Sequence, residues 1–404
     1  MQASYIKEEA EAMKLFQGVD YYRCDHLLTP EERSVRDTVR RWVENQYLPK
    51  VEDYFDHGIF DRDLIPQLAE LGLLGIKIQG YGCSGLTDVI YGLVCQEIER
   101  GDSGLRSFVS VQNSLVMYPI DAFGSESQKA HWLSAMARGE KIGCFGLTEP
   151  DVGSDPARLH TRATREGGDY VLNGHKLWIT NGELADVAVI WARTEEGIRA
   201  FLVEKGTPGF ETYPIRRKYS MRASVTSGLI LDAVRVPAEN LLPGTDGLKS
   251  ALMCLNEARY GIAWGAVGAA MACYDIALDY AKSRIQFGVS IASFQLVQQK
   301  LVNMLTEITK GQLLCIQLGR LKESGQAQHT HVSLAKMNNV SEALTIARTA
   351  RDILAANGIT LDYHVIRHML NLESVYTYEG THDIHTLSIG RDITGYDAFA
   401  PKEP

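Results

Sequence analysis

Glu379 is the first residue whose type and position suggest chemistry, because it is a carboxylate within the segment TYEGTHDIH at 377–385. A carboxylate acts as a general base when it is held beside an acidic C–H bond and its surroundings strengthen it. A glutamate next to a glycine is more often an exposed side chain in a turn, and the pair Glu379–Gly380 alone favours that interpretation. The context of the whole chain has to decide between the two.

Two segments in the middle of the chain have the composition of a ligand-binding loop. FGLTEP at 145–150 is followed by GSDP at 153–156, and WITN lies at 178–181. Small and hydroxyl-bearing residues leave backbone amides that could face a planar polar ligand. Each segment alone is more typical of a turn leading into a strand, or of a packed strand end.

Two histidine pairs, His364 with His368 and His382 with His385, have spacings that could place both imidazoles on one helical face. Neither pair has an acidic or cysteine third ligand in a recognised pattern, and the chain contains no HExxH motif. We therefore expect no metal site. A GxGxxG motif after a strand is also missing, which disfavours a nicotinamide enzyme.

The elements that must position these residues begin with helices. TPEE at 29–32 combines an N-cap threonine, a proline at the first helical position and a glutamate three residues after the cap, and SESQ at 125–128 is a second capping box. Helical stripes of apolar residues follow at Val35, Val39, Trp42 and Val43, at Leu64, Leu68 and Leu71, and at Ile90, Leu93, Val94 and Ile98.

From about residue 141 the apolar period changes to that of strands. Residues 170–172 and 176–179 are predicted to be two strands joined by a type I′ turn at Asn173-Gly174, because this pair tolerates the positive φ that such a turn needs. Further short strands are expected at 187–191, 200–203 and 229–236. After Pro243 the pattern predicts long helices at 247–283, 292–323 and 329–356, then shorter ones near 361–375 and 381–395.

The predicted fold class is mainly α with a central β domain. We expect an N-terminal helical domain at 1–143, a small β-barrel-like domain at 144–246, and a four-helix-type bundle at 247–404. With 404 residues the chain is long enough for two or three domains.

The bulk composition excludes several classes of protein. The net charge of −9, without a long basic run, gives no footprint for nucleic acid, and seven scattered cysteines without a CxxC pair indicate a reducing compartment. The N-terminal MQASYIKEE lacks the apolar core of a signal peptide. The apolar stretch 261–273 is too short to span a bilayer and is typical of a tightly packed helix, so we expect no membrane span.

Taken together, four motifs resemble the acyl-CoA dehydrogenase family over essentially the whole chain. They are RS at 106–107, GLTEP at 146–150, LNEARYGIAW at 255–264 and TYEGTHDIH at 377–385. Within the family the chain is most similar to glutaryl-CoA dehydrogenases. The helical–β–helical order derived above agrees with the family's fold.

The resemblance implies FAD bound against the β domain. Trp178 would shield one face of the isoalloxazine ring, Thr180 would hydrogen-bond near N5, and a neighbouring subunit's Arg284, Phe287 and Gln295 would hold the adenosine end. The implied cofactor-binding residues are Phe145, Leu147, Thr148, Gly153, Ser154, Trp178, Ile179, Thr180, Arg284, Phe287, Gln295, Asn357, Gly358, Thr381 and Phe399. The family usually has GGNG where this chain has AANG at 355–358, so two methyl groups could push that backbone away from the cofactor.

The resemblance also implies that Glu379 is the base that removes the α-proton of an acyl-CoA thioester while the β-hydrogen leaves as a hydride. Arg106 would bind the far carboxylate of a glutaryl group, since guanidinium is a charged bidentate partner that does not lose its proton. The implied substrate-binding residues are Arg106, Ser107, Glu99, Ser154, Asn256, Arg259, Tyr260, Tyr378 and Gly380, with Asn256, Arg259 and Tyr260 facing the coenzyme A arm. Without the resemblance, Arg106 and Arg259 would be interpreted as ordinary ion-pair residues.

The expected reaction is oxidative decarboxylation of glutaryl-CoA to crotonyl-CoA and CO2, a step of lysine and tryptophan degradation. The alternatives are a short-chain acyl-CoA dehydrogenase, an acyl-CoA oxidase, and a non-catalytic flavin- or CoA-binding scaffold. The resemblance further implies electron-transferring flavoprotein as electron acceptor, a homotetramer, and a location in the bacterial cytoplasm or the mitochondrial matrix.

Overall fold

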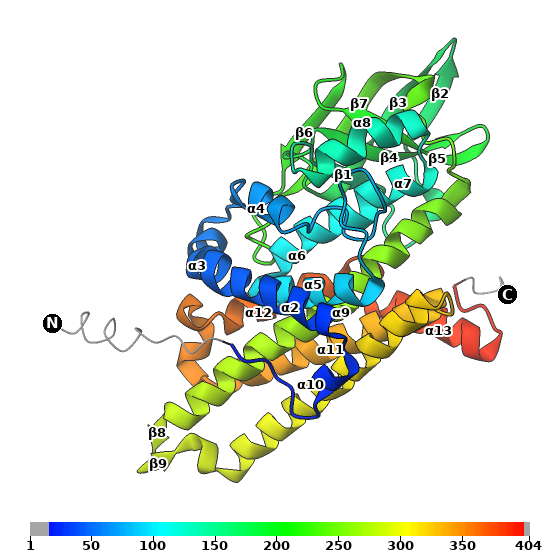
Figure 1. Cartoon of the computed structure of the whole chain (residues 1–404). Coiled ribbons are helices and arrows are strands. Elements are labelled where there is room, and N and C mark those ends of the chain that lie inside the picture. The colour runs from blue at the N-terminus through cyan, green and yellow to red at the C-terminus, as the bar shows by residue number, and fades with distance from the viewer. Residues whose placement is uncertain (1–15, 400–404) are drawn as a thin grey trace.

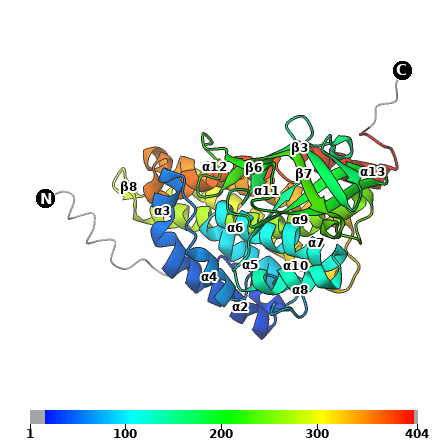
Figure 2. The same ribbon diagram turned by 90° about the horizontal axis from the view of Figure 1, so that it is seen from above.

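The computed structural model describes residues 16–399. The N-terminal segment MQASYIKEE, from which we expect no signal peptide, lies outside this range. The predicted fold class, mainly α with a central β domain, is confirmed. Figure 1 shows the sheet at one end of the molecule and long helices of the bundle running away from it. In the view from above, the N-terminal helices lie along one side of the bundle (Figure 2).

The first helices form where the capping signals predicted them. Both capping boxes are present, at Thr29 with Glu32 and at Ser125 with Gln128. The α-helices of this part are α2 (Pro30–Trp42), α3 (Leu48–His57), α4 (Leu64–Glu70), α5 (Asp88–Gly101), α6 (Ser103–Ser110), α7 (Tyr118–Phe123) and α8 (Glu126–Ala137). Two π-helical turns, η2 (Val43–Tyr47) and η3 (Val111–Met117), interrupt the series, and a sequence period does not predict them.

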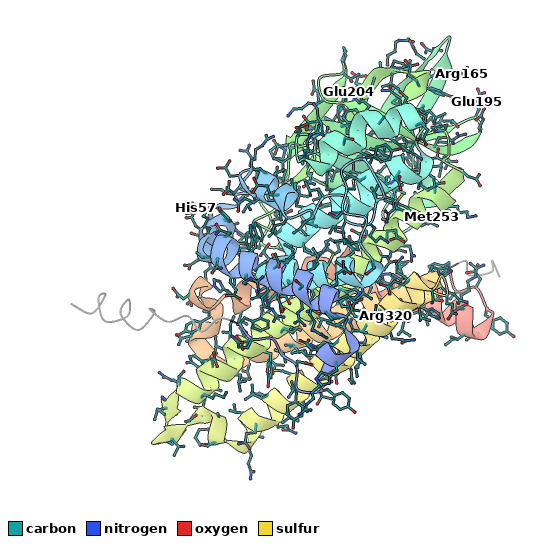
Figure 3. All side chains as sticks on the ribbon, viewed as in Figure 1. His57, Arg165, Glu195, Glu204, Met253 and Arg320 are labelled. Atoms are coloured by element: carbon teal, nitrogen blue, oxygen red, sulfur yellow. The ribbon has the colours of Figure 1, made fainter. Side chains whose placement is uncertain are left out.

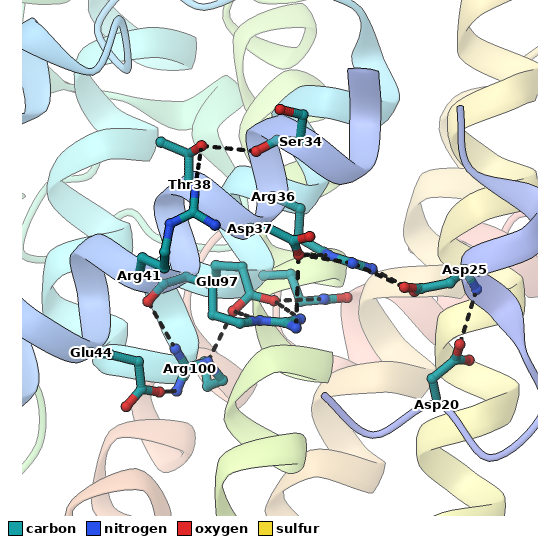
Figure 4. Close-up of polar contacts among 12 residues, drawn as sticks. Asp20, Asp25, Ser34, Arg36, Asp37, Thr38, Arg41, Glu44, Glu97 and Arg100 are labelled. Carbon is teal, nitrogen blue, oxygen red and sulfur yellow. Dashed lines mark hydrogen bonds and ion pairs between the residues drawn. The ribbon is translucent and has the colours of Figure 1, made fainter. Parts of the chain in front are cut away.

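Buried ion pairs join α2 and η2 to α5. Arg100 donates to Glu44 at 2.5 Å and to Glu97 at 2.9 Å, and Arg40 donates to the other oxygen of Glu97 at 2.8 Å (Figure 4). The two guanidinium groups hold the pKa of Glu97 at about 2 although burial acts to raise it. This cluster fixes α5, the helix that carries Glu99, against the N-terminal layer.

The central sheet has seven strands in the order β1-β4-β2-β3-β7-β6, with β5 paired to β4. The strands are β1 (Gly143–Gly146), β2 (Arg162–Glu166), β3 (Asp169–Thr180), β4 (Val187–Thr194), β5 (Gly197–Glu204), β6 (Phe210–Pro214) and β7 (Thr226–Pro237). Exposed charged residues such as Arg165, Glu195 and Glu204 lie at the outer part of this domain (Figure 3).

The predicted hairpin at Asn173-Gly174 is wrong. Residues 169–180 form one continuous strand, and Asn173-Gly174 lies at a register shift against β7 within it. The Asn173 side chain accepts a hydrogen bond from the backbone N–H of Ala233 at 2.8 Å, and a Cβ on Gly174 would come within 2.3 Å of Thr161. The pair therefore makes a bulge that allows close packing, and the hairpin turn lies between β2 and β3.

The C-terminal helices match the predicted ranges closely. They are α9 (Gly247–Ser283), α10 (Gln295–Glu323), α11 (His329–Ile353), α12 (Val365–Thr377) and α13 (His382–Thr394). Among the described residues α9 is the one helix long and apolar enough to cross a membrane, but 78% of its apolar window is buried inside the protein. It is thus a packed helix of the protein interior, as the small-residue stretch at 261–273 predicted.

A loop between β6 and β7 connects the sheet to the helices. The backbone N–H of Met221 donates to Asn371 of α12 at 2.6 Å, and Ser220 hydrogen-bonds Ser374 of the same helix at 2.6 Å. Arg222 of this loop reaches the C-terminal end of α3 and donates to the carbonyl oxygen of Phe55 at 2.7 Å. The loop therefore holds the end of β3, through Asn181 and Val225, in a fixed relation to α12.

Candidate active site

Glu379 lies in the short connection, residues 378–381, between α12 and α13. Tyr378 is the C-cap of α12, and Thr381 is the N-cap of α13, where its side chain accepts from the N–H of Ile384. Glu379 has a left-handed φ of 53°, which is unusual for a residue other than glycine, and Gly380 follows with φ 95°. A Cβ on Gly380 would come within 2.8 Å of His385, so only glycine fits there.

The carboxylate of Glu379 is poised for proton transfer. Its Oε2 is buried without a hydrogen-bond partner among the described residues. Burial raises the pKa of Glu379 above its ordinary value, while Arg106, Arg259 and Lys336 act in the opposite direction. An unsatisfied buried carboxylate with a raised pKa is a stronger base than a solvated one, as a general base requires.

Arg106 forms a buried polar group next to Glu379. Its Nε donates to Oε2 of Glu99 at 2.6 Å, its Nη2 donates to the hydroxyl of Tyr378, and all of the Arg106 and Glu99 surface is covered. Nη1 of Arg106 and Oε1 of Glu99 remain without partners among the described residues. The group therefore keeps one cationic donor available for an anionic ligand. Ser107, the next residue of α6, is also buried.

The three residues expected on the coenzyme A arm differ in position. Asn256 is half-buried, and its Oδ1 has no partner among the described residues. Arg259 donates from Nε to the carbonyl oxygen of Glu379 at 2.6 Å, so it supports the turn of the base. Tyr260 is fully buried and its hydroxyl donates to the carbonyl oxygen of Asp88 at 2.7 Å. The structure does not place Tyr260 on a ligand-facing surface as expected. On α9 its side chain points into the core, where the backbone of Asp88 satisfies its hydroxyl.

The expected flavin-binding residues of the β domain include both buried and open positions. Phe145 and Leu147 on and after β1, together with Ile179, are buried. Trp178 is 59% exposed at a positive φ of 63°, where β3 has a second register shift. Gly153 and Ser154 are exposed, whereas Thr148 and Thr180 are half-buried. An exposed indole beside hydroxyl groups and an open glycine loop fits a planar, polar ring system such as isoalloxazine.

Glu149, a member of the GLTEP motif for which the motif alone predicts no role, is the anchor of the loop after β1. It accepts hydrogen bonds from the N–H groups of His160 and Thr161 and from the buried ammonium of Lys176 at 2.9 Å. Burial acts to raise the pKa of Glu149, but Lys176 and these donors lower it to about 2. Lys176 lies 27 positions after Glu149 in the sequence, so no local spacing of residue types predicts this ion pair. Glu149 therefore fixes the loop after β1.

The residues expected to contact a neighbouring subunit's cofactor lie away from the sheet. Arg284 ends α9 and Phe287 is 94% exposed at the tip of the hairpin of β8 (Ile285–Gln286) and β9 (Val289–Ser290), at the opposite end of the bundle (Figure 1). Gln295, the first residue of α10, is exposed as well. Within one chain these residues cannot join the group around Glu379.

The other predicted contacts lie in two further places. Asn357 donates to the hydroxyl of Tyr280 at 3.2 Å, and Gly358 is buried against the backbone of Arg351. Ala355 is exposed with a left-handed φ of 52°. Thr381 caps α13 beside the candidate base, and Phe399, at the end of the described chain, is 43% exposed.

The structure brings no third ligand to either histidine pair within the part of the chain that it describes. Among residues 16–399, no group of three His, Cys, Asp or Glu side chains has a geometry that could hold a metal ion. Burial lowers the pKa of His385 to about 3 and that of His364 to about 3, so both imidazoles are neutral. The arrangement around Glu379 supports proton transfer and anion binding.

Three family models match consecutive parts of the chain. The acyl-CoA dehydrogenase N-terminal domain matches residues 29–140, the middle domain matches 144–234, and the C-terminal domain matches 245–394. A short-chain-specific acyl-CoA dehydrogenase from Megasphaera elsdenii is 34% identical, over 91% of this chain and 98% of that protein.

Solved structures give higher similarity. The crystal structure of a glutaryl-CoA dehydrogenase from Mycobacterium smegmatis is 55% identical with a TM-score of 0.94, covering 95% of this chain and 100% of that chain. A glutaryl-CoA dehydrogenase from the same organism, in complex with FADH2, is 52% identical with a TM-score of 0.94, covering 95% of this chain and 99% of that chain.

Proposed function

The chain belongs to the acyl-CoA dehydrogenase family, and from this premise we propose that it oxidises glutaryl-CoA and decarboxylates the product to crotonyl-CoA and CO2. The family is FAD-dependent and acts on acyl-CoA thioesters. The observation that supports the finer assignment is the fully buried Arg106, whose Nη1 has no partner within residues 16–399 and whose charge acts on Glu379.

In the first step Glu379 removes the α-proton of the thioester while the β-hydrogen leaves as a hydride with its electron pair. FAD, when bound, supplies the acceptor for that hydride. The chain's contribution is to exclude water from Oε2 of Glu379, which favours the neutral product of proton transfer. The turn between α12 and α13 keeps the carboxylate at a fixed position while the proton moves.

In the second step the far carboxylate leaves as CO2. The C–C bond to that carboxylate breaks, its electron pair enters the conjugated thioester, and the proton held by Glu379 returns to the γ-carbon. Arg106 first binds the carboxylate, and Glu99 and Tyr378, which share the guanidinium, limit how strongly it holds that charge. Ser107 is positioned on the same helix as Arg106 to add a hydroxyl.

A short-chain acyl-CoA dehydrogenase is the second candidate function, because the relative from Megasphaera elsdenii carries that name. Arg106 argues against it. A straight acyl chain would offer no acceptor to Nη1 of Arg106, which is buried without a partner among the described residues, and an unsatisfied buried donor costs free energy.

Anaerobic titration with glutaryl-CoA and with butyryl-CoA separates the two candidates. We expect glutaryl-CoA to bleach the flavin and release CO2, with a higher kcat/KM than butyryl-CoA. Preference for butyryl-CoA, or bleaching without CO2 release, would reject the decarboxylating assignment. Rapid peroxide formation without an added acceptor would instead indicate an oxidase.

The assembly and context follow from the same proposal. We propose a homotetramer in which Arg284, Phe287 and Gln295 of one subunit complete the cofactor site of another, since these residues lie far from their own chain's β domain. We propose electron-transferring flavoprotein as acceptor, a place in lysine and tryptophan degradation, and a location in the bacterial cytoplasm or the mitochondrial matrix.

A further inference from the structure

Lys336 is a buried cation that the reaction scheme above does not use. It lies on α11, is 1% exposed, and burial lowers its pKa to about 7. Burying an ammonium group costs free energy unless hydrogen bonds satisfy it. A helix that needed only to pack would carry an apolar residue there.

The ammonium of Lys336 is satisfied by the turn that carries Glu379. Nζ donates to the carbonyl oxygen of Tyr378 at 3.1 Å and to that of Gly380 at 2.8 Å. Arg259 donates to the carbonyl oxygen between them, that of Glu379, at 2.6 Å. Two buried cations thus hold three consecutive carbonyl groups.

These contacts account for the strained backbone of the base. Glu379 at φ 53° is in a left-handed conformation that an L-residue adopts only when its surroundings hold it there. Fixing the carbonyl groups on both sides of Glu379 fixes the two peptide planes, and therefore the direction of its Cα–Cβ bond. Lys336 Nζ donates to these backbone oxygens, while Oε2 of Glu379 has no hydrogen-bond partner among the described residues.

We propose that Lys336 is a positioning residue for Glu379, which holds the turn of residues 378–380 so that the carboxylate faces the α-carbon of the substrate. The inference rests on the proposed role of Glu379 as base. The charged or titratable groups that face Lys336 are Glu379 on the turn, Arg259 on α9 and Arg106 on α6, with neutral His385 beside the turn on α13.

Exchange of the α-protons of acetyl-CoA in D2O tests this proposal on the intact flavoprotein. Acetyl-CoA has α-hydrogens and no β-carbon, so exchange measures the base without hydride transfer. In Lys336→Met we expect the exchange rate to fall about 100-fold, the loss typical of a misplaced catalytic group, while the Kd of acetyl-CoA changes less than about 3-fold. Lys336→Gln, whose amide can still donate to the carbonyl groups, should give an intermediate rate.

The matched controls are Ser333→Ala, a buried change one turn away on α11, and Glu379→Gln. Ser333→Ala should exchange at the wild-type rate and Glu379→Gln should not exchange. Wild-type exchange in Lys336→Met, or equal loss of binding and rate, overturns the positioning role. Failure of both Lys336 variants to fold makes the residue purely structural and overturns it as well. If wild type does not exchange at all, the assignment of Glu379 as base fails first.

Discussion

Nε of Arg106 donates to Oε2 of Glu99 across 2.6 Å, and neither side chain exposes any surface. Burial acts against the charge of Arg106, but the Glu99 carboxylate outweighs it and holds the Arg106 pKa above its usual range. Arg106 therefore stays a cation inside the protein. The Glu99 carboxylate also offsets part of the positive charge of Arg106. Under the proposed function this weakens the hold of Arg106 on the substrate carboxylate, which has to leave as CO2.

Arg106→Lys tests the role of the guanidinium in substrate choice. Lysine keeps the charge but cannot contact Glu99, Tyr378 and a ligand through a planar fork. We expect kcat/KM for glutaryl-CoA to fall about 100-fold or more, and that for butyryl-CoA to change much less, as measured by steady-state kinetics with both substrates. Equal losses on the two substrates would show that Arg106 does not recognise the far carboxylate.

The Glu379→Gln variant tests the base. We expect it to be less active but more stable than wild type. We expect the rate of flavin bleaching to fall by about 1,000-fold or more, with the cofactor still bound. The raised folded pKa means that protonation of Glu379 stabilises the native state, and this contribution is lost as pH rises from the ordinary value of 4.5 through the folded pKa. Thermal unfolding at pH 7 should therefore give a higher Tm for the variant than for wild type, with the difference vanishing toward pH 4.5. An unchanged Tm at every pH would contradict the raised pKa.

The same raised pKa predicts the acid limb of the pH profile. Only ionised Glu379 accepts the α-proton, so kcat/KM should rise with pH through the folded pKa of Glu379, at a pH above 4.5. Stopped-flow bleaching across pH 4.5–8 measures this limb. A break at or below the ordinary glutamate value would show that burial does not perturb the carboxylate in the free enzyme.

Glu149→Gln removes one partner of a buried ion pair. Lys176, whose pKa burial already lowers to about 8, would lose its carboxylate, so we expect the free energy of unfolding to fall by about 2–4 kcal/mol in urea titrations at pH 7. The folded pKa of Glu149, about 2, lies below the ordinary 4.5, so its contribution is fully present above pH 4.5 and is lost as pH falls toward 2. The stability gap between the two proteins should narrow over that range. A gap that is constant with pH would exclude the ion pair as its cause.

Ala355→Gly should stabilise the protein by about 0.5–1 kcal/mol. The left-handed φ of 52° at Ala355 costs about 1–2 kcal/mol for an L-residue, and the greater chain entropy of unfolded glycine offsets part of the gain. Thermal unfolding measures the difference, with the neighbouring Ala356→Gly as the matched control that should destabilise instead, since Ala356 has no positive φ. Stabilisation by both substitutions would argue against backbone strain at 355.

Local sequence determined the helices. Capping boxes at Thr29 and Ser125 and the long apolar periods after Pro243 set where the helices begin and end, because these signals act over one or two turns. At Asn173-Gly174 the same kind of local signal gave a wrong prediction, a hairpin turn. Positive φ suits a turn and a bulge equally, and Thr161, which crowds Gly174, belongs to another part of the chain.

The motif around Glu379 likewise identified the candidate base, but only the tertiary structure decided what surrounds it. Lys336 lies 43 residues before Glu379 in the sequence and Arg259 lies 120 before it, and helices α9 and α11 bring both to one turn. The residue type at each position is readable from the chain, whereas burial and the pKa of a carboxylate depend on every group within a few ångströms. Helix packing therefore determines whether a glutamate beside a glycine is an exposed turn residue or a base.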